Sequence, residues 1–412
     1  MANEEKRVMI VTFKPKDQRP DTKKDKVDIV RAEIRPDVSF FTADDFSRGV
    51  PIPSAMPEEM IGYDVNQYEA PIVMAHLTEK EIEALKKNEN IAAVEEDGPC
   101  WAMGEPQMPE TLVIESQPSV MAETIPAGIA QIKAPSAWDC TKGKVIKVAV
   151  LDTGIDYKHP DLSPNFRWGI SFVSGESSVM DYNSHGTHCA GIIAAALNGI
   201  GVVGVAPAVY LYGVKVLPKA GPGAWSNLIA GIDWCINKKD LDILSMSLGA
   251  SSAPSAVENI CNSAWKKGAL LIAAAGNILP AAPANSVMCP AKYNSVIAVS
   301  NIDSTNQRWP SSCYGPEVEL CAPGVNVLST VPGGGYGTKT GTSMACPHVA
   351  GAAALALGTH RYASNVTIRR LLAWRADDLG LPGRDPEYGF GRVDAEQVAA
   401  ERKMPPAITG IP

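Results

Sequence analysis

The chain has 412 residues and a formal net charge of −8, with 45% hydrophobic and 20% charged residues. This length exceeds what one hydrophobic core usually supports, so we expect two or three domains of ordinary globular composition. The acidic balance argues against nucleic acid as a partner, and no apolar run is long enough to cross a bilayer.

The first hundred residues predict a small α/β unit. Strands are expected over 7–13, 71–77 and 91–96, and a helix over about 21–33. A second helix follows the capping box formed by Thr78 and Glu81, and it runs to about Lys87. One strand is unclear within 36–66. This order is typical of a ferredoxin-like β-α-β-β-α-β domain.

A change of pattern follows. Residues 104–122 are polar, without a period, and contain Pro106, Pro109 and Pro118, so they predict an exposed linker of the kind that is cut. From 123 to 400, apolar strands alternate with helices. The strands are expected over 145–151, 209–217, 243–248, 269–275 and 295–300, and the helices over 185–197, 226–238 and 255–267. The tail, 401–412, carries several prolines and is expected to trail over the surface.

Repeated β-α units with apolar strands predict an α/β fold, a parallel sheet with helices on both faces. Ligands and catalysis then belong at the carboxyl ends of the strands. Three polar residues fall there. Asp152 ends a strand, His185 opens a helix, and Ser343 lies where a glycine-rich segment meets an apolar helix.

Each of these residues also has an ordinary structural interpretation. Asp152 can form a turn, a single histidine is more often structural, and Ser343 can be a helix N-cap. Together they are an acid, a base and a nucleophile at one sheet edge. Activation of a serine hydroxyl requires this set, in which the histidine takes the proton and the carboxylate orients the histidine.

The segments around these residues extend the pattern. They read Val-Leu-Asp152-Thr-Gly-Ile-Asp, His185-Gly-Thr-His-Cys-Ala-Gly and Gly-Thr-Ser343-Met-Ala-Cys-Pro-His-Val-Ala-Gly. They resemble the three motifs of subtilisin-like serine proteases (subtilases), in the same order, and the resemblance covers roughly 123–400. It implies a serine endopeptidase, expected as a monomer without a catalytic cofactor. It also implies that Asn277 and the Ser343 amide hold the oxyanion.

The resemblance further implies how substrate is bound. Ser247, Leu248 and Gly249 would pair with an extended substrate, and Gly221 and Gly223 would form the facing strand. Trp225 would lie at the rim of an outer apolar subsite. The S1 site would be lined by Ala274, Gly276, Ile278 and Met288. Because Ile278 and Met288 are apolar, we expect an apolar P1 residue, with Met288 making the site shallower.

Residues 1–103 resemble the inhibitory propeptide of secreted subtilases, whose last residues lie in the active site as a product does. The position of Asp97 predicts self-cleavage between Met103 and Gly104, with Ala102 in S2 and Cys100 in S4. A second cut near Ala122 would remove the extension. The propeptide resembles that of secreted members, whereas the charged N-terminus without a hydrophobic leader favours a cytoplasmic location.

Calcium is implied by the same resemblance. Six residues would supply oxygen ligands through side chains or backbone carbonyls, a donor set that suits Ca²⁺: Glu123, Asp161, Ala196, Asn198, Ile200 and Val202. An ordinary polar loop is the alternative.

Other chemistries fit less well. His185 and His188 lack the HExxH spacing and a third ligand for zinc. Cys189 is expected to be a buried thiol, similar to the one beneath the histidine in some subtilases, which implies sensitivity to mercurials. The nine cysteines contain no CxxC pair, so reduced thiols and one or two disulfides both stay open. The rival functions are a non-catalytic binding module and a processing protease of narrow specificity.

Overall fold

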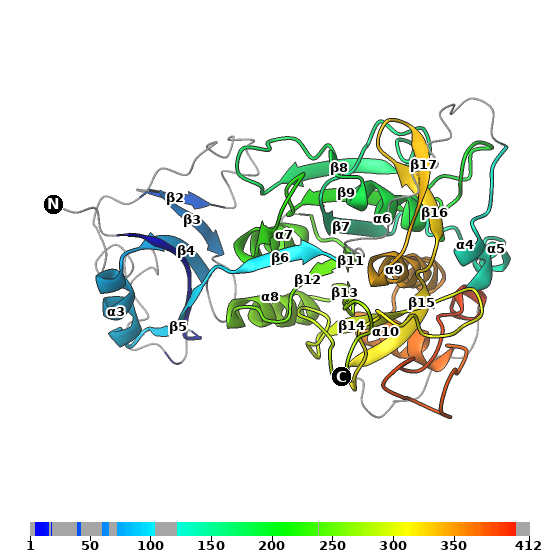
Figure 1. The fold of residues 1–412 in the computed structure, drawn as a ribbon. Helices are drawn as coiled ribbons and strands as arrows, with labels where there is room; N and C mark the ends of the chain where they lie inside the picture. Colours follow the sequence, from blue (N-terminus) through cyan, green and yellow to red (C-terminus); the bar gives the residue numbers. More distant parts are fainter. Residues whose placement is uncertain are drawn as a thin grey trace.

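The computed structural model describes residues 5–15, 18, 39–42, 60–65, 72–103, 122–237 and 239–400. Figure 1 shows a small N-terminal sheet beside a larger α/β unit, joined by one strand. No helix in these ranges is long and apolar enough to cross a membrane.

The small sheet has five strands in the order β2-β3-β4-β1-β5. They are β1 (Arg7–Phe13), β2 (Ser39–Thr42), β3 (Met60–Val65), β4 (Ile72–Leu77) and β5 (Ile91–Glu96). Helix α3 (Glu79–Lys87) begins at Thr78 with the expected capping box. The order β3-β4-β1-β5 is the one that a ferredoxin-like chain produces, and β2 adds a strand parallel to β3. The helix expected over 21–33 lies outside the described residues.

Alternation along the strands gives this sheet two apolar faces. One face presents Met9, Val11 and Phe13 to α3. The other presents Ile10, Ile72 and Met74 to the apolar cluster of the larger unit. The small sheet is therefore buried between its own helix and the neighbouring unit (Figure 1).

The larger unit is built on a seven-stranded sheet in the order β15-β14-β13-β11-β7-β9-β8. All of its neighbouring strands are parallel, which confirms the predicted parallel α/β fold. Its strands are β7 (Lys147–Asp152), β8 (Phe166–Ser171), β9 (Tyr210–Lys215), β11 (Ile243–Met246), β13 (Leu270–Ala274), β14 (Val296–Ile302) and β15 (Val318–Pro323). The edge strands β8 and β15 were not predicted, because their sequences lack a continuous apolar run.

Helices cover both faces of this sheet, because its strands are apolar on both. Ala149 and Leu151 of β7 face a cluster with α7 (Trp225–Asn237) and α8 (Ser255–Lys266). Val148 and Val150 face α6 (His185–Ala194) and α9 (Thr342–Thr359). The shorter helices are α4 (Ala127–Gln131), α5 (Ala134–Ala137), α10 (Asn365–Trp374) and α11 (Ala395–Ala399).

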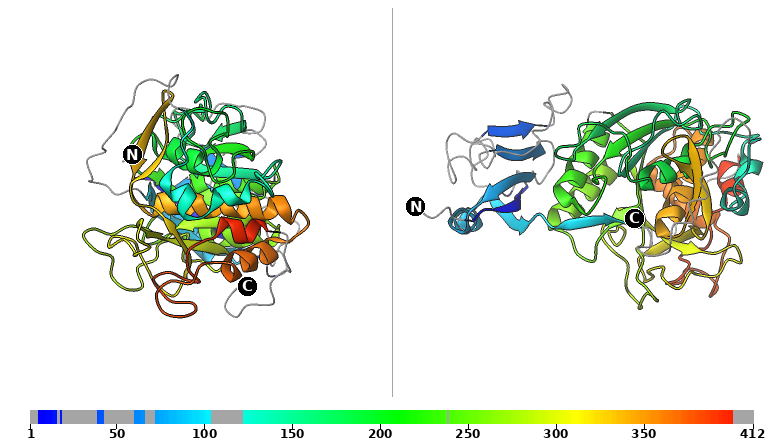
Figure 2. Two further views of the ribbon diagram at one scale, coloured as in Figure 1. Left: turned by 90° about the vertical axis from the view of Figure 1, so that its right-hand side faces the viewer. Right: turned by 45° about the horizontal axis from the view of Figure 1, so that its top comes forward.

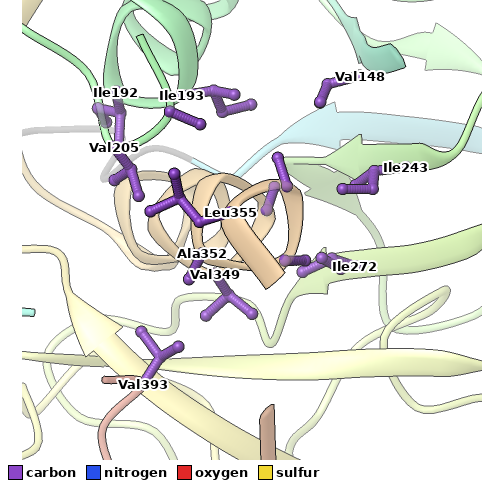
Figure 3. Close-up of a cluster of buried hydrophobic side chains, with 14 of the residues drawn as sticks. Val148, Ile192, Ile193, Val205, Ile243, Ile272, Val349, Ala352, Leu355 and Val393 are labelled. Atoms are coloured by element: carbon purple, nitrogen blue, oxygen red, sulfur yellow. The ribbon is translucent and has the colours of Figure 1, made fainter. Parts of the chain in front are cut away.

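Helix α9 is the central element of the core. Its Val349, Ala352 and Leu355 lie among side chains of α6 and the sheet, as Figure 3 shows. Its small residues allow close approach: a Cβ on Gly351 would lie 2.5 Å from Cβ of Val205. The hairpin of β16 (Val327–Val331) and β17 (Gly335–Lys339) leads directly into this helix. Packing on all sides fixes the position of its first turn, which carries Ser343.

Candidate active site

Asp152 and His185 form the first part of the site. Asp152 is the last residue of β7, an interior strand of the large sheet, and is 0% exposed. Its Oδ1 lies 2.7 Å from Nδ1 of His185, the first residue of α6, and it also accepts a 2.7 Å hydrogen bond from the Thr153 amide. A buried carboxylate against Nδ1 holds the proton there and leaves Nε2 as the basic nitrogen.

Ser343 is the second residue of α9, and Gly341 is the N-cap, so the interpretation of Ser343 as a helix N-cap is wrong. Its Oγ donates to the Ser247 carbonyl at 3.2 Å. Nε2 of His185 has no hydrogen-bond partner within the described ranges. The direct hydrogen bond from serine to histidine is therefore not formed in this structure. Catalytic hydrogen bonds of this kind are often long before substrate binds.

Asn277 lies beyond the end of β13. Its Oδ1 accepts from the Thr342 amide at 3.0 Å, and its Nδ2 donates to the backbone carbonyl of Met103. The Thr342 amide thus fixes which end of the Asn277 amide faces Met103, because only the NH₂ end can donate. The sequence did not single out Thr342.

The strand that leads into Met103 lies between two short strands of the larger unit. Strand β6 (Pro99–Ala102) pairs antiparallel with β10 (Gly223–Ala224) on one side and β12 (Leu248–Gly249) on the other. The Met103 amide also donates to the Ser247 carbonyl at 2.9 Å. Strand β6 leaves the small sheet and enters the larger unit, as Figure 1 and the right-hand view of Figure 2 show.

The Met103 side chain, which is 6% exposed, belongs to the same buried apolar cluster as Ala274, and Met288 packs against that cluster. A Cβ on Gly249 would lie 2.8 Å from Cε of Met103. Met288 packs against Gly276, where an added Cβ would lie 2.7 Å from its Cγ. Ala274 is buried at the end of β13, and Ile278 packs at the edge of the same apolar cluster as Met288.

The structure also places two further residues of the predicted substrate site. Trp225 is 1% exposed and shares a buried apolar cluster with Leu248 and with Cys100, the residue expected in S4. Gly221 precedes β10 in an exposed loop and forms no part of the β6–β10 pairing, which begins at Gly223.

The loop after α6 collects the oxygen atoms expected to bind calcium. Oε1 of Glu123 accepts from the amides of Asn198 and Gly199 at 2.7 and 3.2 Å. Buried Asp161 accepts from the Val202 amide at 3.0 Å and the Asn198 side chain at 3.2 Å. Among the described residues, no backbone amide donates to the carbonyls of Ala196 and Val202, whereas Ile200 forms an isolated antiparallel bridge with Ala122. Two carboxylates, an amide and backbone carbonyls are oxygen donors that fit Ca²⁺.

The buried groups near the triad are poor candidates for other chemistry. Nε2 of His188 bonds to the carbonyls of Val327 and Gly337 at 2.9 and 3.1 Å, so this nitrogen is not available to a metal. Burial lowers the pKa of His188 to about 3. Burial also raises the pKa of the Cys189 thiol well above its usual value, so a thiolate nucleophile is disfavoured. All nine cysteines are free, and all but Cys140 are buried.

Two carboxylates of the N-terminal unit reach helix N-termini of the larger unit. Glu95 accepts from the Ser255 amide at 3.0 Å, at the start of α8, and from the Ser255 hydroxyl. Asp97 accepts from the Ser226 amide at 3.0 Å, in the first turn of α7. Burial raises the pKa of the Asp97 carboxyl, and the hydrogen bonds from Ser226 and Trp225 oppose that shift. Neither contact was predicted from the sequence.

The fold and the geometry define the class of enzyme. An α/β protein that places an acid, a histidine and a serine at a helix start beside an amide donor has the groups that a serine hydrolase needs. Comparison with known protein families narrows this class. Residues 143–391 match the model of the Subtilase family.

Curated relatives agree with the family match. Subtilisin E of Bacillus subtilis (strain 168) is 43% identical over 327 residues, which cover 79% of this chain and 80% of the relative. An alkaline protease of Shouchella clausii is 42% identical over 327 residues, 79% and 78% of the two chains. A subtilisin of Bacillus pumilus is 46% identical over 280 residues, 68% and 100%. This chain belongs to the subtilase family and is a serine-type endopeptidase, as the sequence resemblance predicted.

Proposed function

We propose that the chain is a zymogen that cuts itself between Met103 and Gly104 and then hydrolyses other proteins. Residues 1–103 are the inhibitory prodomain, 104–122 a processed linker and 123–400 the peptidase domain. The observation that carries this proposal is the Met103 carbonyl, which accepts from Asn277 Nδ2 while its strand is paired on both edges.

The catalytic roles follow from the geometry. Ser343 Oγ attacks the carbonyl carbon of the residue in S1, and Nε2 of His185 accepts the hydroxyl proton and returns it to the leaving amine. Asp152 keeps the Nδ1 proton in place through its 2.7 Å contact. The oxyanion is held by Asn277 Nδ2 and by the amide of Ser343, since amides in the first turn of a helix have no partner within the helix.

The β6 contacts explain inhibition as well as cleavage. After the bond is cut, β6 keeps its pairing with β10 and β12 and leaves Met103 in S1. Main-chain pairing of this kind accepts any extended sequence, and the alternate side chains supply selectivity. The same contacts therefore support broad specificity with an apolar P1 residue.

The two prodomain carboxylates give a first prediction. Replacing Glu95 with Gln and Asp97 with Asn together should weaken retention of the cut prodomain by about 3–30-fold. Each amide keeps an acceptor oxygen but loses the negative charge, which is worth about 0.3–1 kcal/mol at a helix N-terminus. After self-cleavage, the lag before peptide hydrolysis should shorten accordingly. Glu83→Gln, in an exposed pair with Lys86, is the matched control, and an unchanged lag in the double variant would refute the anchoring role.

The packing of Met288 on Gly276 gives a second prediction, on P1 specificity. Met288→Gly enlarges S1, so kcat/KM for peptides with Phe at P1 should rise about tenfold or more relative to Ala at P1, since one or a few methylenes are worth about 10–200-fold in such sites. A P1 series of chromogenic peptides measures this. Leu381→Gly, which removes an exposed side chain elsewhere, should leave the ratio unchanged. If the Phe-to-Ala ratio of kcat/KM is unaltered in Met288→Gly, a residue other than Met288 limits the size of S1.

We also propose that the loop after α6 binds Ca²⁺. Asp161 and Glu123 would supply its charge and Asn198 and the three carbonyls its remaining ligands. When bound, the ion would neutralise two carboxylates that both accept hydrogen bonds from Asn198. Glu123 and Asp161 also accept hydrogen bonds from the loop, and none of the six residues contacts the triad in the bonds described above. The proposed role is therefore structural, and no catalytic step passes through the ion.

A substitution at the junction tests the proposed function. Met103→Asp places a charge in an apolar S1 site, which leaves a buried carboxylate unpaired. Self-cleavage at this bond should slow by at least about 10², measured by intact mass over time. Met108→Asp, in the linker, is the control. If Met103→Asp is cut at the normal rate and position, Met103 does not occupy S1 and the proposal is wrong.

A further inference from the structure

Asp181 lies four residues before His185 and is 1% exposed. Its carboxylate accepts five hydrogen bonds from neighbouring residues. Oδ1 accepts from the Thr153 hydroxyl at 3.0 Å and the amides of Asn183 and Ser184 at 2.8 and 3.1 Å. Oδ2 accepts from the amide and hydroxyl of Thr187 at 2.9 and 2.7 Å. One side chain thus gathers three segments.

These contacts connect the two elements that carry the acid and the base. Thr153 follows Asp152, and its amide donates to Asp152 Oδ1 at 2.7 Å. Its hydroxyl, which donates to Asp181, accepts from the amide of Gly186 at 2.9 Å. Thr187 lies two residues after His185 in the first turn of α6. Asp181 therefore holds the end of β7 and the start of α6 together from behind the Asp152–His185 contact.

The backbone at Ser184 shows why this clamp is needed. Ser184, directly before His185, has φ 93°, a left-handed conformation that a residue other than glycine rarely adopts. Its amide is one of the donors to Asp181. The turn that aims His185 is therefore held by the carboxylate against its own conformational preference.

A carboxylate suits these donors better than an amide does. All five groups that contact Asp181 donate, and a carboxylate offers about four acceptor positions on two oxygens. In Asp181→Asn one oxygen becomes an NH₂ group that faces donors. The negative charge is also favourable at the N-terminus of α6.

We propose that Asp181 is a positioning residue that sets the His185 imidazole against Asp152 and Ser343. This inference rests on the proposed catalytic roles of those residues. Asp181 itself contacts none of the reacting atoms. Since a misplacement of about 1 Å can cost about 10² in rate, its removal should lower kcat more than it changes KM.

The test uses Asp181→Asn and Asp181→Ala in the full chain, with kcat calculated per active site titrated by a fluorophosphonate. We expect kcat to fall about tenfold in Asp181→Asn and about 10² in Asp181→Ala, with KM within about twofold. Asp303→Asn is the matched control, because Asp303 accepts from Thr305 and Gln307 in a turn away from the triad. Thr153→Val removes one link while Asp181 stays, and should lower kcat severalfold.

Two results would overturn the inference: normal kcat per titrated site in both Asp181 variants, or a loss equal to that in Asp303→Asn. If an Asp181 variant fails to fold, the Thr153→Val variant decides the test. An unchanged kcat in Thr153→Val would show that Asp181 does not position His185 through Thr153. An unsubstituted chain without peptidase activity would instead refute the proposed catalytic roles, so the two failures are distinguishable.

Discussion

Replacing Ser343 with Ala should leave the full-length chain whole and lower kcat/KM toward peptides by about 10⁶, because no other group can form the acyl-enzyme. Ser343 lies in the first turn of α9, directly after Thr342, whose amide donates to Asn277. Cys189 and Cys346 are buried thiols whose pKa values are raised by burial, so neither replaces it. Intact mass and a chromogenic peptide assay measure both effects.

The control for this substitution is Ser263→Ala on α8, which removes a hydroxyl that bonds only to the backbone of its own helix. That variant should cleave itself and hydrolyse peptide at the normal rate. A Ser343→Ala chain that cuts itself as fast as the unsubstituted chain would place the nucleophile elsewhere.

Asn277→Ala should lower kcat by about 10²–10³ with little change in KM, because the lost donor acts on charge that develops only in the transition state. The Asn277 side chain is well prepared for this role: Thr342 holds its Oδ1 at 3.0 Å, and Nδ2 faces the Met103 carbonyl. Steady-state kinetics on a peptide substrate separate the two constants. Self-cleavage should slow by a similar factor, since it uses the same donor.

Asn259→Ala, on α8 and away from β6, controls for the loss of an asparagine side chain. It should leave both constants unchanged. If Asn277→Ala instead raises KM and keeps kcat, the side chain contributes to ground-state binding alone, and the oxyanion role is wrong.

The sequence predicted the centre of this fold well because the central strands are buried on both faces. Continuous apolar runs at 145–151 and 269–275 leave little choice of structure, and they became β7 and β13. The motif residues could also be located, since each lies at the end of a strand or the start of a helix. The family and the endopeptidase activity followed from the same three motifs.

Other features depend on contacts between distant segments and leave little local signal. Strands β10 and β12 have two residues each and exist as strands only through their pairing with β6. The burial of Trp225 arises because β6 and the small sheet cover it. Asp181 could have been suspected from its place before the helix that His185 opens, since acidic residues are favoured there. Its hydrogen bond with Thr153 could not have been predicted, because the two residues are far apart in the sequence.

Three kinds of contact hold the small sheet against the peptidase unit. Ile10, Ile72 and Met74 join the apolar cluster of α7 and α8, while Glu95 and Asp97 contact the starts of the same two helices. The last strand of the small unit then enters between β10 and β12. Apolar burial, two charged contacts and main-chain pairing thus all direct Met103 to one place.

The most direct test of this account is an intact-mass time course of the full chain at several protein concentrations. The account predicts that the first products are residues 1–103 and a fragment that begins at Gly104, formed at a rate independent of concentration because the bond already lies in its own active site. A first cut elsewhere, or a rate that rises in proportion to concentration, would contradict it.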